Sequence, residues 1–171
     1  MSSIPEFGEL LAATKQSAVH LEMRDSYYSN PRFEAWKQGH RTDWDDRASW
    51  WRSFHQQIAD AAGRGVRIRR ARIISEPVSE YIRWEHYVTR ANVEAGELVR
   101  WLPRHRTADL LVPGCDFWIF DDRLIRVHHF SGDGNWESKE LREDPSIVQM
   151  SSTAFEKIWE RATPHDEYEV K

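Results

Sequence analysis

The sequence contains a single cysteine, no long apolar run and no excess of basic residues. With Cys115 alone an internal disulfide cannot form, which fits a reducing compartment. No window approaches the roughly 18 apolar residues that a membrane-spanning helix needs, and the N-terminal stretch lacks the basic and apolar segments of a signal peptide. The net charge of −4 argues against a general nucleic-acid binder, because nonspecific affinity for phosphate backbones needs excess positive charge. We therefore expect a cytoplasmic protein that contacts neither membrane nor nucleic acid directly.

Tryptophan, by contrast, is abundant, with nine copies in 171 residues. An indole carries a large apolar area and one donor, so it suits cores, interfaces and ligand walls alike, and composition does not choose among them. The length predicts a single domain over 1–171, with an N-terminal helical and strand portion at 1–64 and a main portion at 65–171.

Hydrophobic periodicity and turn residues predict an alternation of helices and strands. The expected helices cover 5–14, a short turn at 32–38, 45–62, 78–95 and 152–162. The expected strands cover 17–25, 66–75, 97–103, a hairpin over 116–130 and an additional strand over 136–143. Strand, helix and strand from 66 to 102 require a crossover with parallel pairing, and the hairpin extends the same sheet. The fold class is therefore α/β, or α+β, with helices packed on a mixed twisted sheet.

The strand at 66–75 is unusual because four arginines interrupt its apolar pattern. Alternation divides the strand into one face with Val66, Ile68, Arg70, Arg72 and Ile74, and another with Arg67, Arg69, Ala71, Ile73 and Ser75. A buried guanidinium must find acceptors, since an unpaired buried charge costs several kcal/mol.

Two interpretations of these arginines compete. In the first, carboxylates pair with them inside the fold; the candidates are Glu76, Glu80, Glu85, Asp116 and Asp121. In the second, one or two guanidiniums stay unpaired and bind an anionic ligand at the carboxyl end of the sheet, where open α/β sheets favour ligands. A phosphate, carboxylate or nucleotide would suit the forked donors.

Metal and nucleophile motifs are missing. His128 and His129 are adjacent in a strand and face opposite ways, so they cannot easily ligate one metal. Cys115 follows Pro113 and Gly114 with no basic residue fixed beside it, which favours a buried structural thiol. No Gly-x-Ser-x-Gly elbow is present. We expect neither a metal nor a cofactor.

Four segments together resemble an actinobacterial family of small proteins of unknown function, typical of Streptomyces and its relatives. They are "HLEMRDSY", "RIRRARIISEPVSEYIRWEHYVTRANVEAGELVRWLPR", "PGCDFWIFDDRLIRVHHFSGDG" and "AFEKIWERATPHDEY". Genes of that family often lie beside those of helix-turn-helix regulators and small partner proteins. The resemblance implies a regulatory or accessory role, with such a regulator or a small partner protein as the partner.

The order of elements over 66–130 is also similar to half of a phospholipase D-like domain, as found in degenerate, noncatalytic modules. The His-x-Lys-x4-Asp signature of the active members is absent, because His128 and His129 are followed by Phe130 and Ser131. The resemblance therefore implies the layout of that half-domain and argues against phosphodiester hydrolysis.

These observations favour a nonenzymatic module that binds a small anionic ligand or docks onto a helix-turn-helix transcriptional regulator. The residues expected to form its cleft are Arg70, Arg72, Glu76, Tyr81, Arg83, Trp84, Trp101, Arg104, Asp116, Trp118 and His128. The alternative is a small hydrolase or transferase acting on an anionic, phosphate-containing substrate. Its acid–base groups would come from Glu76, Asp116, Asp121 or His128. Assembly into a homodimer is left open.

Overall fold

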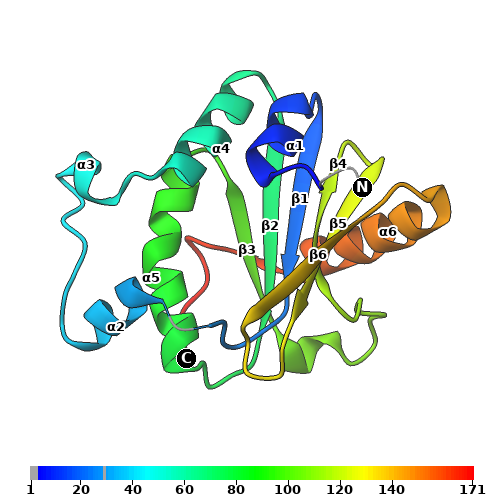
Figure 1. Cartoon of the computed structure of the whole chain (residues 1–171). Coiled ribbons are helices and arrows are strands. Elements are labelled where there is room, and N and C mark those ends of the chain that lie inside the picture. The colour runs from blue at the N-terminus through cyan, green and yellow to red at the C-terminus, as the bar shows by residue number, and fades with distance from the viewer. Residues whose placement is uncertain (1–3, 29) are drawn as a thin grey trace.

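A mixed β-sheet forms the centre of the molecule in the computed structural model, which describes residues 4–28 and 30–171 (Figure 1). Over these residues the sheet has seven strands in the order β6-β5-β4-β1-β2-β3-β7. The strands are β1 (Ser17–Glu22), β2 (Arg67–Ile74), β3 (Leu98–Pro103), β4 (Asp116–Phe120), β5 (Leu124–Phe130), β6 (Trp136–Arg142) and β7 (Thr163–Pro164). Strands β1, β2 and β3 run parallel, and the other neighbours pair antiparallel. The expected mixed sheet, its parallel crossover and its hairpin are confirmed.

Helices cover both faces of this sheet (Figure 1). They are α1 (Phe7–Ala13), α2 (Pro31–Lys37), α3 (Arg47–Trp50), α4 (Ser53–Gly63), α5 (Glu80–Glu94), the 3-10 helix η1 (Arg104–Thr107) and α6 (Pro145–Arg161). Helix α6 packs on one face, where Phe155 and Ile158 contact the apolar residues of β1 and β2. Helices α1, α4 and α5 pack on the other face. Within the described residues, none of the helices combines the length and the apolar character that crossing a membrane requires.

Helix α2 lies beside α5, and α3 lies further out from the sheet (Figure 1). The ring of Phe33 on α2 packs edge-on against Tyr81 of α5, with centroids 5.1 Å apart. Beyond α2, Trp44 lies 5.5 Å from the ring of Tyr87, and the Arg90 guanidinium lies over Trp44. Helix α2 and Trp44 are therefore attached to the body of the protein mainly through α5.

The prediction of one continuous helix over 45–62 is wrong, because this segment forms two helices, α3 and α4. The chain is extended at Trp51 and Arg52, between α3 and α4. A continuous helix would point neighbouring side chains about 100° apart, whereas the rings of Trp50 and Trp51 pack 5.7 Å from each other. Aromatic packing overrides local helix propensity here.

The C-terminal helix starts earlier than the sequence predicted. Asp144 accepts hydrogen bonds from the backbone amides of Ser146 and Ile147, and Pro145 occupies the first turn, where it needs no amide partner. Helix α6 therefore begins at Pro145, not near Ser152, although its end agrees with the prediction. The short strand β7, which follows it, was not predicted.

Candidate functional site

Strand register brings polar side chains together on the face that α1, α4 and α5 cover. His20 in β1 pairs with Arg70 in β2 on one side and with Trp118 in β4 on the other. Trp118 in turn pairs with Arg126 in β5. Two residues further along each strand, on the same face of the sheet, Glu22 lies opposite Arg72, and Asp116 lies opposite His128. Two neighbouring rows across the sheet are thus largely polar although they are buried.

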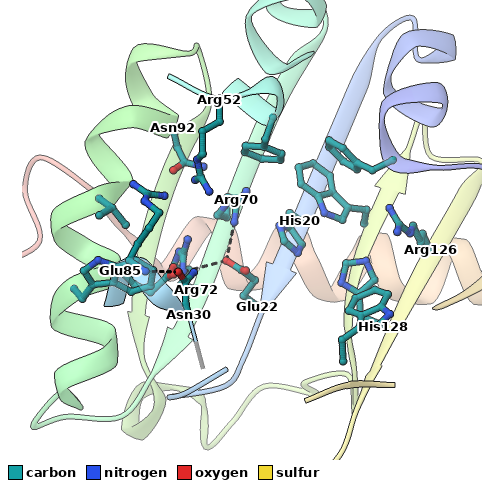
Figure 2. Close-up of a pocket in the computed structure, with 17 residues that line it drawn as sticks. His20, Glu22, Asn30, Arg52, Arg70, Arg72, Glu85, Asn92, Arg126 and His128 are labelled. Carbon is teal, nitrogen blue, oxygen red and sulfur yellow. Dashed lines mark hydrogen bonds and ion pairs between the residues drawn. The ribbon is translucent and has the colours of Figure 1, made fainter. Parts of the chain in front are cut away.

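These rows form the floor of a cavity with a volume of about 360 Å³ (Figure 2). Its walls come from α1, the start of α2, the start of α4, one side of α5 and the edge strand β6. The break before α4 places Arg52 at the mouth, and Asn30, whose side chain caps α2, directs Arg32 from the first turn of that helix. The volume falls within the range of small-molecule pockets, roughly 300–1,000 Å³.

The buried arginines of β2 are paired inside the fold. Arg70 donates from Nε to Glu97 over 2.7 Å and from Nη1 to Glu22 over 2.9 Å. Arg72 donates to Glu85 and lies 3.2 Å from Glu22 (Figure 2). Internal pairing, the first of the two interpretations, is confirmed for Arg70 and Arg72, but among its candidate carboxylates only Glu85 takes part. The expectation that one of these two buried guanidiniums stays unpaired is wrong. The register places Glu22 between the two arginines, a relation that no local pattern reveals.

This ion-pair network stays charged over the ordinary pH range. Burial alone would raise the pKa of Glu22, but Arg72 and Arg70 hold it well below its usual value. Burial would likewise lower the pKa of Arg70, but Glu97 and Glu22 raise it. The network joins two guanidiniums to three carboxylates, so it carries a net charge of −1 and leaves neither arginine without an acceptor.

Three other guanidiniums reach the cavity without such a partner. In the part of the chain that the structure describes, Arg32, Arg52 and Arg126 line the cavity and form no ion pair. Burial lowers the pKa of each, and the nearby Arg32 lowers that of Arg52 further. Arg126 is only 7% exposed, and its Nε has no hydrogen-bond partner. The sequence interpretation missed all three, because each stands alone among unrelated neighbours.

Two buried imidazoles lie between these arginines. The ring of His20 stacks on Trp118 with centroids 4.3 Å apart, and His128 lies 5.7 Å from His20. Nδ1 of His20 and Nε2 of His128 have no hydrogen-bond partner in the described chain. Burial lowers the pKa of His20 well below its usual value and that of His128 to about 4, where Arg126 adds to the effect. Both rings are therefore neutral near pH 7.

About half of the predicted cleft residues come together. Those that line the cavity are Arg70, Arg72, Trp84, Trp118 and His128. Asp116 lies opposite His128 in the sheet but does not line this cavity, and it accepts hydrogen bonds from the Met23 amide and the Tyr27 hydroxyl. Burial raises the pKa of Asp116 to about 6.

The other predicted residues lie elsewhere or support the floor. Trp101 is buried beneath Arg72, with the guanidinium 5.2 Å from its ring, and Tyr81 donates to Glu85. Glu76 accepts from Tyr168 near the C-terminus, and Arg104 donates to backbone oxygens. Arg83 is exposed on α5. Asp121, a candidate acid, accepts from the amides of Lys15, Gln16 and Ser17. None of these residues lines the cavity, so the prediction that Glu76, Tyr81, Arg83, Trp101 and Arg104 lie around it is wrong.

Stability is expected to fall as the pH is lowered from 7 to 5. The unfolded chain protonates His20 and His128 below about pH 6.5, whereas the folded chain resists protonation until about pH 4 at His128. Stability from these two residues is therefore lost over that interval, and His128 alone accounts for about 2 kcal/mol at pH 5. Asp116 acts in the opposite sense, because its raised pKa favours the folded state below about pH 6, and offsets roughly 1 kcal/mol. Urea unfolding at pH 7, 6 and 5 measures the net loss.

The matched variants for this measurement are His128→Asn and His40→Asn. His128→Asn is expected to flatten the pH dependence, because the buried base is gone. His40 is exposed, so His40→Asn should leave the dependence unchanged. A stability that stays constant from pH 7 to 5 would contradict the burial of neutral imidazoles.

Solved structures from several protein classes are similar in fold. Nuc, a phospholipase D family member from Salmonella typhimurium, matches with a TM-score of 0.53 and 10% identity, over 92% of this chain and 86% of that chain. TrmBL2, an archaeal chromatin protein, matches with a TM-score of 0.49 and 13% identity, over 91% of this chain and 47% of that chain. Phosphatidylserine synthase from Haemophilus influenzae Rd KW20 matches at 0.48 and 13% identity, over 95% of this chain but 38% of its own.

The chain thus spans less than half of the length of two of these proteins, and 86% of Nuc. At 10% identity the likeness to Nuc shows the fold alone, and it confirms the expected phospholipase D-like layout. A search of the curated proteins found no match. A family described as a domain of unknown function (DUF6879) matches residues 5–170.

Proposed function

Since the chain belongs to the family described as a domain of unknown function (DUF6879), a match that brings no activity with it, we propose from the cavity itself that this domain binds a small organic anion. It works through that binding as a nonenzymatic regulatory or accessory module. The observation that carries the proposal is the set of three guanidiniums, Arg32, Arg52 and Arg126, which face one cavity without an ion-pair partner in the described chain. A ligand carrying about two negative charges fits this set best.

The charges around the cavity support a ligand with about two negative charges. Five arginines and two glutamates line it, and Glu97 pairs with Arg70 from behind, which leaves an excess of two positive charges. Guanidiniums bind phosphate and carboxylate groups in a forked geometry, and such charge-assisted hydrogen bonds are strong where water is partly excluded. Unpaired, desolvated cations cost stability, and costly arrangements of this kind concentrate at binding sites.

Pyrophosphate is a suitable first probe, because it offers two anionic groups. We expect it to raise the melting temperature of the wild-type chain at constant ionic strength, with a stabilisation of about 2.7 kcal/mol at 100 times its Kd. The double variant R52Q/R126Q should lose this response. Without the probe, the same variant should be at least as stable as the wild type, because two unpaired cations have been removed. Differential scanning calorimetry measures both effects.

Arg123→Gln serves as the control for a lost positive charge. Its guanidinium is exposed at the hairpin turn, outside the cavity, and pairs only with Glu143. This variant should respond to pyrophosphate like the wild type. If pyrophosphate, phosphate and citrate all fail to stabilise the wild type more than R52Q/R126Q, the proposed function is wrong.

One observation favours the enzymatic alternative, a hydrolase or transferase acting on a phosphate-containing substrate. His20 and His128 present neutral rings with unpartnered nitrogens close to each other, and a neutral imidazole is a competent general base. Asp116, with its raised pKa, supplies a second titratable group next to His128. Turnover of bis(4-nitrophenyl) phosphate that His128→Asn abolishes would support this alternative over simple binding.

Four further expectations stay predictions. Docking onto a helix-turn-helix regulator or a small partner protein rests on the resemblance of the sequence, as does an actinobacterial origin. The cytoplasmic location rests on composition. Assembly into a homodimer is equally a matter for measurement, and sedimentation of the purified chain decides it.

A further inference from the structure

The mouth of the cavity contains an exposed indole. Trp136, at the start of the edge strand β6, lines the cavity and is 42% exposed, and it is the one exposed residue among the nine tryptophans, all of which lie in the described part of the chain. Its neighbours His128 and Phe130 pack edge-to-face, at interplanar angles of 63° and 89°. In the described residues no aromatic ring lies parallel to the indole, and the group that lies over its face is the Arg126 guanidinium.

The cation next to this indole also lacks a partner. The Arg126 guanidinium lies 5.9 Å from the centroid of Trp136, and its Nε is a buried donor without an acceptor. The inner aromatic of the cavity, Trp118, is different, because His20 stacks on it and Phe7 packs 4.9 Å from it. The wall of β5 and β6 therefore offers a partly exposed indole without a stacked aromatic partner, next to a donor without an acceptor, which suits a planar heterocycle with acceptor atoms.

The opposite wall offers charge instead. Arg52 lies on the other side of the cavity from Arg126, with Arg70 and His20 between them (Figure 2). Arg32 is close enough to Arg52 to lower its pKa by repulsion. A single negative charge would compensate only one of these two neighbouring cations, whereas a phosphate dianion compensates both and accepts hydrogen bonds from both forks.

From these two walls we infer that the ligand is a phosphate monoester of a planar ring compound, of the nucleoside monophosphate class. Its phosphate lies between Arg32 and Arg52, and its ring stacks on Trp136 with an acceptor atom toward Arg126. This inference rests on the proposed anion-binding function and adds the chemical class of the anion. It also assigns Trp136 as a specificity-determining residue, which the sequence interpretation did not single out.

Isothermal titration calorimetry with the full chain tests this class. The probes are the four common nucleoside 5′-monophosphates, ribose 5-phosphate, which has the phosphate but no base, and adenosine, which has the base but no charge. At least one nucleoside monophosphate is expected to bind about 10-fold or more tightly than ribose 5-phosphate, as base stacking on an aromatic side chain predicts. Adenosine is expected to bind weakly, because it leaves Arg32 and Arg52 uncompensated.

Variants separate the two walls. Trp136→Ala should reduce the affinity for the best nucleoside monophosphate to that for ribose 5-phosphate, and Trp136→Phe should restore most of it. Arg52→Gln should weaken every phosphate probe, with or without a base. Met150→Ala, which shortens an exposed apolar side chain on α6 outside the cavity, should change nothing.

The outcomes distinguish this inference from the function on which it rests. If ribose 5-phosphate binds as tightly as every nucleoside monophosphate, the ring subsite is wrong and the anion site stands. If pyrophosphate binds but none of the phosphate monoesters does, the class is wrong. If no anionic probe binds the wild type, both proposals are wrong. Even if Trp136→Ala fails to fold, comparing the probes on the wild type still tests the ring subsite.

Discussion

Glu97→Gln is expected to lower the free energy of unfolding by about 3 kcal/mol, because breaking a buried ion pair leaves an uncompensated charge. Glu97 is 1% exposed and accepts from Arg70 over 2.7 Å and from the Asn92 side chain over 2.7 Å. Without its charge, Arg70 would depend on Glu22, which Arg72 already shares. Urea unfolding at pH 7 measures the loss.

Glu94→Gln provides the matched control, since the same change is made at an exposed position. Glu94 pairs with Arg90 on the surface of α5, where an ion pair contributes about 0.5 kcal/mol or less. The two variants remove the same charge from nearly the same region of the sequence. Equal losses of stability in both would contradict the view that the Arg70 network is a buried structural unit.

Phe155→Ala is expected to cost about 3–5 kcal/mol, the range for truncating a fully buried aromatic ring. Phe155 has no exposed surface and joins α6 to the central strands in a cluster with Leu21 and Ile73. The Arg69 guanidinium lies 5.2 Å from the centroid of its ring and is held there by Glu156. The truncation thus leaves a cavity and removes a contact of a buried cation. The midpoint of thermal or urea unfolding reports the cost.

Met150→Ala on the same helix should cost less than about 0.5 kcal/mol, as for an ordinary surface position. The side chain of Met150 is 66% exposed. A large loss from Met150→Ala together with a small one from Phe155→Ala would mean that α6 packs on the sheet through a different face.

The sequence was sufficient to predict the elements that local patterns encode. Alternation defined β1, β2 and the hairpin of β4 and β5, where Asp121 and Asp122 adopt positive φ at the turn as these residues tolerate. Parallel pairing of β2 with β3 followed from the intervening helix. Long-range packing explains the errors. The extended step at Arg52 depends on how neighbouring indoles pack, and the early start of α6 depends on a cap at Asp144 that was overlooked.

The candidate site was harder to predict for a physical reason. Whether an arginine is paired depends on which strand lies next to it and in what register, and neither is a local property. Glu22 neutralises part of both Arg70 and Arg72 from a position almost 50 residues away in the chain. Among the arginines that remain unpaired, Arg126 lies in a sequence context that resembles any surface strand, and Arg32 and Arg52 lie at helix starts. The pattern of polar residues in the strands predicted the floor of the cavity, but it did not predict which of the charged groups are unpaired there.

The segment between β1 and α4 packs on α5 through Phe33 and Trp44, and this has a mechanical consequence. This segment provides Arg32 and Arg52, whereas Arg126 belongs to the rigid sheet. A ligand that binds Arg126 together with Arg32 or Arg52 would connect this peripheral segment to the body of the protein. Binding of a ligand in the cavity would then slow amide exchange and proteolysis along α2 and α3. A second macromolecule that contacts only this segment would in this way respond to ligand binding in the cavity.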